Sequence, residues 1–433
     1  MEAVKFVELQ VEKWRQFDSV TVPIHPRLTV ITGANGAGKT TLLGFLTQHF
    51  GWSRPLLATP WRNKDGTTTY TTGAINSIIR WIKTDGLSNT QSQMQTQIGR
   101  IRYSDGSLAT ITTPSTSDVQ YSPQFTDQKD VKGLYIPSHR ALSQYQAVGS
   151  IPTHGISPTQ AYGNYRSELY SRWYGHQSTM SPLFRMKEAL ISMATFGEGN
   201  TYVDGKPELL QAYLGFIDVL TKVLPETLGF KTLAIRTPDV MLITSSGDFL
   251  LDAVSGGISA LIDLAWQIHT FSHESKVFTV VIDEPENHLH PSMQRALLPK
   301  LMDAFPLVQF VVATHSPFIV TSVRDSNVVV LSYKEGEQDG MDRGVAPIRS
   351  IYSTQLDQIN MASNANDILR DVLGLESTVP LWASRELQGI VQRYRNQPFD
   401  GAQVDQLSKE LDALGLGGEL PAAINAVFEK GAR

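Results

Sequence analysis

Eight residues near the N-terminus have the types and the spacing of a phosphate-binding loop. They read Gly33-Ala34-Asn35-Gly36-Ala37-Gly38-Lys39-Thr40 and fit the pattern G-x-x-x-x-G-K-[ST]. Glycines let successive backbone N–H groups curl around phosphate oxygens at a helix N-terminus. We expect Lys39 to neutralise the β- and γ-phosphates and Thr40 to offer its hydroxyl to Mg²⁺. The predicted ATP-binding residues here are Gly33, Asn35, Gly36, Ala37, Gly38, Lys39, Thr40 and Thr41.

Two carboxylates end a strongly apolar run later in the chain. Asp283 and Glu284 follow residues 277–282, which are typical of a buried strand, where an unpaired charge is unfavourable. We assign Asp283 to the Mg²⁺ shell, through water, and Glu284 to polarising the attacking water. The alternative is a solvated pair at a strand end. His315 follows the next apolar run, 308–313, and its place at the same sheet edge favours a sensor of the γ-phosphate over a structural histidine.

A further anion-binding element precedes these carboxylates. Ser255, Gly256 and Gly257 open a long apolar helix, and the N-terminus of a helix attracts anions. A serine cap followed by glycines is common, so the motif alone is weak. Its position 26 residues before Asp283 strengthens the prediction.

The elements around these residues occur in the order that phosphate binding requires. A β-rich run at 27–32 leads into the glycine loop, and residues 41–46 have helical spacing. The two apolar runs, 277–282 and 308–313, flank a helical stretch, which predicts a βαβ unit of a parallel sheet covered on both faces. Two hairpins are expected, one around Asp105-Gly106 and one around Ser246-Gly247-Asp248.

Together the motifs resemble the ATPase head of the ABC family, whose elements occur here in the family's order. They are a Walker A loop at 33–40, a signature at 255–257, a Walker B pair at Asp283-Glu284, a D-loop at 285–291 and a switch histidine, His315. The wording Asp-Glu-Pro-Glu-x-x-Leu-His-Pro with Ala-Thr-His-Ser-Pro-Phe is most similar to the RecF, SMC and OLD branch rather than to transporter subunits. No membrane partner is therefore implied.

The resemblance implies an α/β fold and a dimer. The fold is a P-loop NTPase head of the ABC type, a mixed sheet with an antiparallel β subdomain, interrupted by a helical insertion and followed by a helical C-terminal region. In the dimer, two chains pair head to tail, and Ser255, Gly256 and Gly257 of one close on the γ-phosphate held by Lys39 of the other. Hydrolysis then requires pairing.

This resemblance divides the chain into four parts. Residues 1–145 and 231–335 form the two halves of the head, and the second half carries the signature, the Walker B pair, the D-loop and the switch histidine. Residues 146–230 form a mainly helical insertion. Residues 336–433 form a helical region for assembly or partner binding.

The chain departs from the family at the Q-loop glutamine. The strand predicted at 133–137 runs into Ser138-His139-Arg140, and Gln144 and Gln146 lie further on. Which of these residues completes the Mg²⁺ shell stays open. The D-loop accounts for His288 and His290 better than a metal pair does.

In OLD nucleases the ATPase is followed by a TOPRIM nuclease with a Glu and an Asp-x-Asp cluster. The stretch 334–342 lacks that spacing and a buried strand, so we interpret it as a solvated loop. We therefore predict no nuclease site in the chain itself. A separate head with an insertion and a short helical tail, at 366–374, resembles the ATPase subunits of the two-gene anti-phage systems PARIS and Septu, and we favour PARIS.

That resemblance implies several partners: a second copy of the chain, a separate effector nuclease of TOPRIM or HNH type, and a phage-encoded trigger protein. A different hypothesis is a RecF-like DNA-repair ATPase that clamps duplex DNA on ATP-dependent dimerisation. A third is a module that assembles on ATP and hardly hydrolyses it. The interleaved rings and cations at 162–174 are best explained by packing, ahead of a protein interface or nucleic-acid contact.

Composition limits the remaining classes. The chain has 433 residues, a net charge of −5 and no cysteine, so it has no disulfide framework and no general attraction for nucleic acid. We find no apolar leader or membrane-spanning stretch and expect the cytoplasm as its compartment.

Overall fold

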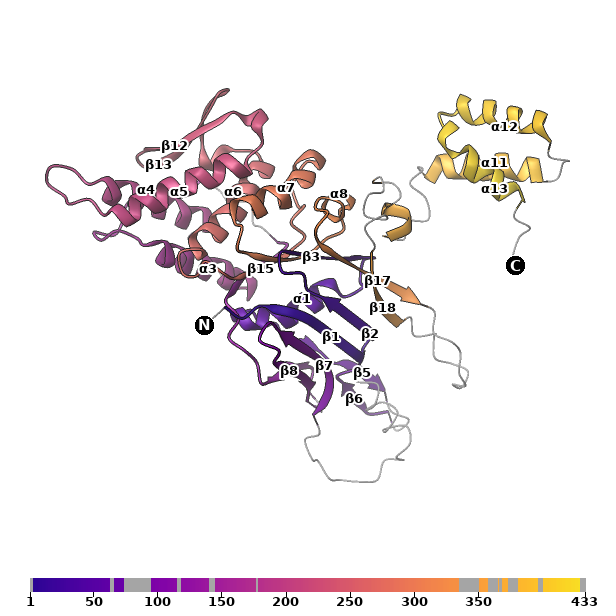
Figure 1. Cartoon of the computed structure of the whole chain (residues 1–433), viewed down its shortest axis with the longest axis horizontal. Helices are drawn as coiled ribbons and strands as arrows, with labels where there is room; N and C mark the ends of the chain where they lie inside the picture. Colours follow the sequence, from indigo (N-terminus) through magenta and orange to yellow (C-terminus); the bar gives the residue numbers. More distant parts are fainter. Residues whose placement is uncertain are drawn as a thin grey trace. The chain divides into compact units, whose positions relative to one another are not determined.

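The chain forms two compact units, Met1–Ser363 and Asn364–Arg433, which are described separately (Figure 1). The computed structural model describes residues 3–62, 66–73, 95–114, 118–139, 145–176, 178–334, 350–356, 365, 368–372, 381–395 and 400–428. Among the helices in these ranges, none has both the length and the apolar character needed to cross a membrane.

An 11-stranded mixed sheet is the centre of the first unit. Its order is β10-β8-β7-β1-β2-β18-β17-β3-β16-β15-β11. The strands β17, β3, β16, β15 and β11 run parallel to one another, whereas β1, β2, β7, β8 and β10 pair antiparallel. The bounds are β1 Phe6–Trp14, β2 Phe17–Pro23, β3 Leu28–Gly33, β7 Thr96–Tyr103, β8 Leu108–Thr113, β10 Gln124–Thr126, β11 Gly133–Ile136, β15 Thr279–Asp283, β16 Gln309–Ala313, β17 Asn327–Lys334 and β18 Ser350–Gln355.

Three of the parallel strands are buried along their whole length. Every residue of β3, β15 and β16 is buried, because a parallel sheet carries packed layers on both faces. This explains why their sequences are continuous apolar runs rather than alternating ones. The predicted strands at 27–32, 277–282 and 308–313 and the α/β fold class are confirmed.

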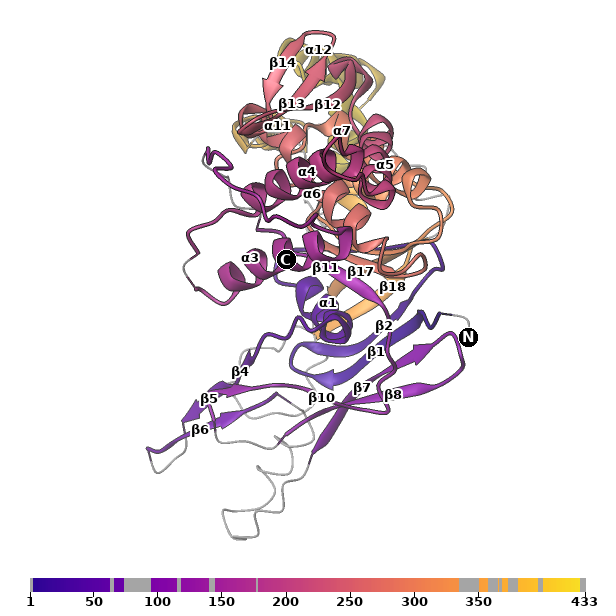
Figure 2. The same ribbon diagram turned by 90° about the vertical axis from the view of Figure 1, so that its left-hand side faces the viewer.

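The helices of the first unit lie mostly to one side of its antiparallel strands, as both views show (Figures 1 and 2). Helix α1 (Lys39–Thr47) follows β3, and α6 (Gly256–Phe271), α7 (Pro291–Ala304) and α8 (Pro317–Val320) belong to the second half of the head. Helices α3 (Pro158–Trp173), α4 (Pro182–Glu198) and α5 (Pro207–Val223) occupy the stretch predicted as a helical insertion. Helix α5 packs against α4, α6 and α7, and α3 packs against α4 and α6.

Three small sheets complete this unit. Strands β12 (Phe230–Arg236), β13 (Asp239–Thr244) and β14 (Gly247–Leu250) form one of them. Strand β4 (Leu56–Leu57) pairs with β9 (Gln120–Tyr121), and β5 (Thr59–Arg62) pairs with β6 (Thr68–Thr71). The two predicted hairpins are confirmed as β7–β8 and β13–β14.

The C-terminal part differs from the helical region expected from residue 336 onward. Strand β18 lies inside that stretch and pairs with both β17 and β2, so the head includes it and the second unit begins at Asn364. The polar sequence Ser350–Gln355 gives no local strand signal, and neighbouring strands on both sides supply its backbone partners. The second unit contains α11 (Leu381–Arg395), α12 (Gly401–Ala413) and α13 (Leu420–Phe428). They share a small core that includes Ile390, Tyr394, Leu407 and Leu411.

Gly33, the last residue of β3, leaves no room for a side chain between β3 and β17. Gly33 has φ 137°, and a Cβ there would lie 2.3 Å from the Leu331 carbonyl oxygen of β17. Gly33→Ala is therefore expected to lower the free energy of unfolding by about 2–4 kcal/mol, measured by urea denaturation. Gly44→Ala is the control, because nothing lies within 4 Å of a Cβ at that position of α1, and it is expected to raise stability by up to about 1 kcal/mol. Equal effects of the two changes would contradict this account.

Candidate ATP-binding site

The glycine loop joins β3 to α1 and depends on two left-handed glycines. Gly36 has φ 78° and Gly38 has φ 83°, and Gly38 caps α1. A Cβ on Gly38 would lie 2.3 Å from Cζ of Phe17, so the ring that begins β2 leaves room there only for glycine. Gln16 Nε2 donates a hydrogen bond to the Gly36 carbonyl at 2.8 Å. The β1–β2 hairpin therefore packs against the glycine loop and supports it. The sequence alone did not indicate this contact.

Lys39 folds back over the loop that carries it. Its Nζ donates to the carbonyl oxygens of Gly33 at 3.0 Å and Ala34 at 3.1 Å. Only 6% of the residue is exposed, and burial lowers the pKa of Lys39 to about 8. The ammonium group is thus held where phosphate oxygens would enter the loop.

Asp283 lies against the glycine loop at the end of β15. Thr40 Oγ1 donates to Asp283 Oδ2 at 2.9 Å, so the two residues predicted to hold Mg²⁺ meet in the folded chain. Burial raises the pKa of Asp283 to about 6, and the nearby carboxylates of Glu284 and Glu286 act in the same direction. A cation between these oxygens would relieve the unfavourable burial of charge. The donor set of a hydroxyl and carboxylates fits Mg²⁺.

Glu284 is held by a residue of the neighbouring strand β16 and by a residue of the turn that follows it in the chain. Its backbone N–H donates to the Ala313 carbonyl at 2.9 Å, and its φ is 47°. Asn287 Nδ2 donates to Glu284 Oε2 at 3.0 Å and to the Ser138 carbonyl at 3.2 Å. Asn287 therefore links the Walker B pair to the segment after β11, a role that the sequence analysis missed.

Two of the Q-loop candidates, Ser138 and Gln146, make different contacts. The Ser138 carbonyl accepts a hydrogen bond from Asn287, which also binds Glu284, whereas the side chain of Gln146 bonds to residues near α4. Gln146 Nε2 donates to the Thr179 carbonyl at 2.8 Å, and its Oε1 accepts from the Ser181 N–H at 2.9 Å, so Gln146 supports the start of α4. Arg140 and Gln144 lie outside the described residues.

Glu286 fixes the segment that carries the switch histidine. Its Oε1 accepts hydrogen bonds from the Thr314 hydroxyl at 2.7 Å and from the His315 N–H at 2.8 Å. In the described part of the chain its buried Oε2 has no hydrogen-bond partner. His315 Nδ1 lies 3.4 Å from Lys39 Nζ, and burial together with the Lys39 charge lowers the pKa of His315. The spacing of Glu286 after Glu284 was the available signal, and the sequence analysis gave it no role.

The signature residues form a separate, open surface. Ser255 and Gly256 are exposed, and the Ser255 side chain makes no capping hydrogen bond at the start of α6. A Cβ on Gly257 would lie 3.0 Å from the His288 carbonyl oxygen, so the signature packs on the D-loop. Within the described residues, no hydrogen bond joins residues 255–257 to the glycine loop. His290 caps α7 by accepting from the Ser292 N–H.

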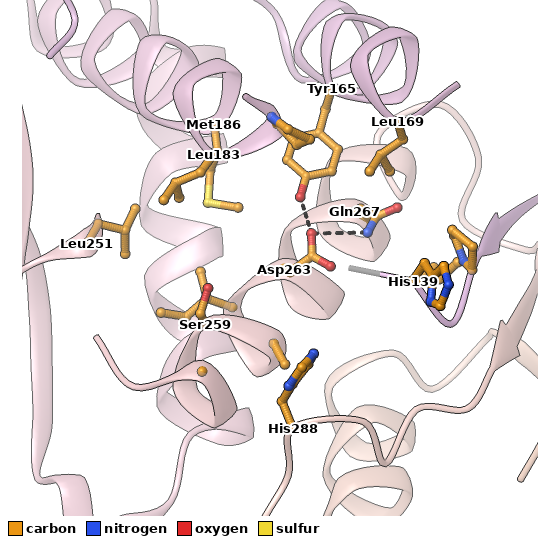
Figure 3. A pocket seen from close by; sticks show the side chains of 16 residues that line it. His139, Tyr165, Leu169, Leu183, Met186, Leu251, Ser259, Asp263, Gln267 and His288 are labelled. Atoms are coloured by element: carbon orange, nitrogen blue, oxygen red, sulfur yellow. Dashed lines mark hydrogen bonds between the residues drawn. The ribbon is translucent and has the colours of Figure 1, made fainter. Parts of the chain in front are cut away.

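A pocket lies between the insertion and the signature helix (Figure 3). Leu183, Met186 and Leu251 form part of its apolar wall. Tyr165 and Gln267 both donate to Asp263 Oδ1 on α6, the latter at 3.2 Å. His139 and His288 also line the pocket. The pocket is therefore bordered by the segment after β11, the D-loop, the insertion helices α3 and α4, and α6.

The aromatic and basic stretch at 162–174 contributes mainly to internal packing. Tyr162 and Tyr165 are buried, Arg166 donates to the Phe50 carbonyl at 2.6 Å, and Tyr174 donates to the Ser53 carbonyl. These contacts attach α3 to the segment after α1 and support the packing interpretation. The stretch 335–342, examined for a nuclease motif, lies outside the described residues.

Comparison with known families places both halves of this site in ATPase domains. Residues 8–144 match the model "AAA domain", and residues 242–321 match "AAA domain, putative AbiEii toxin, Type IV TA system". A retron Vc95 probable ATPase of Vibrio cholerae serotype O1 biovar El Tor is 29% identical over 132 residues, which are 30% of this chain and 23% of the relative. The Septu protein PtuA of Bacillus thuringiensis is 22% identical over 170 residues, covering 36% of this chain and 40% of the relative.

Two more distant likenesses span most of the chain. An OLD nuclease of Thermus scotoductus (strain ATCC 700910 / SA-01) is 24% identical over 361 residues, 77% of this chain and 65% of the relative. The SMC head domain from Thermotoga maritima has 12% sequence identity and a TM-score of 0.37, with coverage of 82% of this chain and 99% of that one.

The fold and the converging motifs define a P-loop ATPase head of the ABC type. Within that class the matched models and relatives support a likeness to the RecF/SMC/OLD branch and to ATPases of defence systems. It matches less than half the length of the retron and Septu relatives. The preference for PARIS over Septu stays a prediction.

The two shifted pKa values predict how pH governs Mg·ATP binding. As pH falls through about 6, Asp283 gains a proton and no longer attracts Mg²⁺; as pH rises through about 8, Lys39 loses the charge that pairs with phosphate. Affinity is therefore expected to be highest between these values, measured with a fluorescent ATP analogue. In EDTA the acidic limb should reverse, since protonated Asp283 no longer repels the phosphates. The same acidic limb with and without Mg²⁺ would contradict the assignment of Asp283.

The bonds of Glu286 predict a role in placing His315. Glu286→Ala removes the acceptor of the Thr314 hydroxyl hydrogen and of the His315 N–H, which is expected to destabilise the fold by about 1–3 kcal/mol. Single-turnover phosphate release is expected to fall about tenfold, a loss of about 1.4 kcal/mol in transition-state binding. Glu286→Gln keeps an acceptor oxygen and is expected to retain most of both properties. If the glutamine variant is as impaired as the alanine variant, the carboxylate charge matters rather than these bonds.

Proposed function

We propose that this chain is a cytoplasmic ATPase subunit of a bacterial anti-phage defence complex. The observation that carries the ATPase proposal is the hydrogen bond of 2.9 Å between Thr40 and Asp283, made at the sheet edge where Lys39 is buried in the glycine loop. Thr40 and Asp283 would hold Mg²⁺, which supplies charge neutralisation on the transferred phosphate. Lys39 would bind the phosphates, with Gly33, Asn35, Gly36, Ala37, Gly38 and Thr41 completing the loop.

Glu284 and His315 supply the catalytic part of this proposal. Asn287 orients Glu284 Oε2, which suits a base that positions a water molecule. Burial and the Lys39 charge lower the pKa of His315, so it is neutral at pH 7 and can accept or donate a hydrogen bond at the γ-phosphate. Turnover is expected to be slow in the single chain, because the signature residues lie on another surface.

The exposed signature supports a head-to-tail dimer. Ser255 and Gly256 are exposed, and the N-terminal N–H groups of α6 receive no side-chain cap from Ser255. Such a helix end favours an anion. We propose that Ser255, Gly256 and Gly257 complete the ATP site of a second copy, so that ATP joins the two subunits.

The defence role rests on the relatives. The similar proteins are named as a retron probable ATPase and a Septu protein, and we propose that this chain holds and regulates a separate effector nuclease of TOPRIM or HNH type. A phage-encoded trigger protein would release it. Nucleic-acid contact is possible within such a complex but is not the primary role.

Glu284→Gln tests hydrolysis and assembly together. The amide cannot accept a proton from water, so phosphate release is expected to fall about 10²–10⁴-fold while Mg·ATP affinity persists. Dimers should then accumulate with ATP, as measured by analytical ultracentrifugation. Equal, near-zero rates in the native chain and the variant would favour a module that assembles on ATP without hydrolysing it.

Lys39→Ala is the matched control for this experiment. It is expected to bind no nucleotide, to stay monomeric with ATP and to give no protection in a phage challenge. Unchanged protection would contradict the regulatory proposal. DNA binding by the native chain that requires ATP and weakens with salt would instead favour the DNA-clamping hypothesis.

A further inference from the structure

A lysine of the insertion is completely buried beside the approach to the signature. Lys187 is 0% exposed and lies on the inward face of α4, next to buried Met186 and Ala189. Its Nζ lies 2.7 Å from Asp252 Oδ2 and 3.2 Å from Asp239 Oδ1. Both carboxylates are largely buried, so one cation balances two anions inside the protein. Burial of three charges without such pairing would be strongly unfavourable.

The three charged groups come from segments far apart in the chain. Asp252 lies in the short turn Leu251–Ala253, three residues before Ser255, and Asp239 begins β13. Tyr145 donates to Asp239 Oδ2 at 3.1 Å, and its ring centre is 5.1 Å from Lys187 Nζ. The Lys187 cluster, defined as these four residues, thus ties the insertion, the small sheet and the approach to the signature to one buried point.

Apolar packing alone does not determine how α4 is placed against the turn Leu251–Ala253. The pocket in Figure 3 is lined by Leu183 and Met186 of α4, by Leu251 of the short turn Leu251–Ala253 and by Ser259 of α6. Apolar contact is non-directional, whereas an ion pair of 2.7 Å defines where Asp252 sits relative to α4. The buried ion pair therefore adds a directional anchor to the backbone that leads to Ser255.

We propose that Lys187 is a positioning residue that holds Ser255, Gly256 and Gly257 where they close on the nucleotide of a second subunit. The helical insertion thereby sets whether the composite site is competent. This inference rests on the proposed head-to-tail dimer. It assigns no contact between Lys187 and ATP.

Two alanine variants separate positioning from general stability. Asp252→Ala and Asp239→Ala each leave the buried lysine with one carboxylate, but only the first releases the segment that leads to the signature. Asp252→Ala is expected to lower phosphate release at least about tenfold, with Kd for Mg·ATP within about twofold of the native chain. Asp239→Ala is expected to lower the rate much less. Unfolding midpoints and circular dichroism establish that both variants fold.

Mixing subunits shows which half of the site is damaged. An Asp252→Ala subunit keeps its Lys39, and a Lys39→Ala subunit keeps its signature, so their heterodimer contains one complete composite site. An equimolar mixture is expected to regain about a quarter of the native rate if pairing is random. Ser255→Arg mixed with Lys39→Ala is the positive control. Ser255→Arg mixed with Asp252→Ala should regain nothing, since both affect the signature.

Each outcome decides between the proposals. Recovery with Lys39→Ala, and none with Ser255→Arg, supports the role of the Lys187 cluster; Lys187→Met should behave in the same way. Recovery in the positive control without recovery for Asp252→Ala overturns this inference alone. No recovery in the positive control overturns the head-to-tail dimer and this inference with it. Loss of nucleotide binding by Asp252→Ala, or a native rate, also overturns the inference.

Discussion

The hydrogen bond from Thr40 to Asp283 joins two segments that lie 243 residues apart in the chain. It exists only because β3 and β15 flank β16 in one parallel sheet and end at the same edge. The same edge buries Lys39 and brings His315 beside it. Charges of both signs are thus withdrawn from water together, and each depends on the others for a partner. The sheet, the β1–β2 hairpin and the D-loop all help to hold these buried groups in place.

The motifs at this edge are predictable from sequence because each is local. A glycine loop and a buried strand that ends in carboxylates are short patterns, and the serine-glycine helix start gains its meaning from its place before that strand. Glu286 and Asn287 could not be assigned, because their partners, His315 and Ser138, lie in segments that follow other strands. Strand β18 and the Lys187 cluster could not be predicted from the sequence for the same reason, because pairing between distant segments leaves no periodic signal in the chain.

The proposed site draws on two elements of the head. One is the glycine loop, which is proposed to bind phosphate, and the other is the exposed start of α6, which has no side-chain cap from Ser255. The insertion lies between the segment after β11 and that helix, with Gln146 supporting α4 at Ser181 and Tyr145 joining the Lys187 cluster. These two adjacent residues therefore reach the start of α4 in the insertion and Asp239 of β13 outside it.

The carbonyl oxygens of Gly33 and Ala34, which accept hydrogen bonds from Lys39, would compete with phosphate oxygens for its ammonium group. If a triphosphate entered the loop, the ammonium group would exchange two oxygens of the protein for oxygens of the ligand. The binding free energy would then be the difference between two similar sets of charge-assisted bonds rather than the full strength of either. Gly36, Gly38 and the bond from Gln16 already set the curvature of the loop, so the entropy of ordering it would be lost during folding and not on binding.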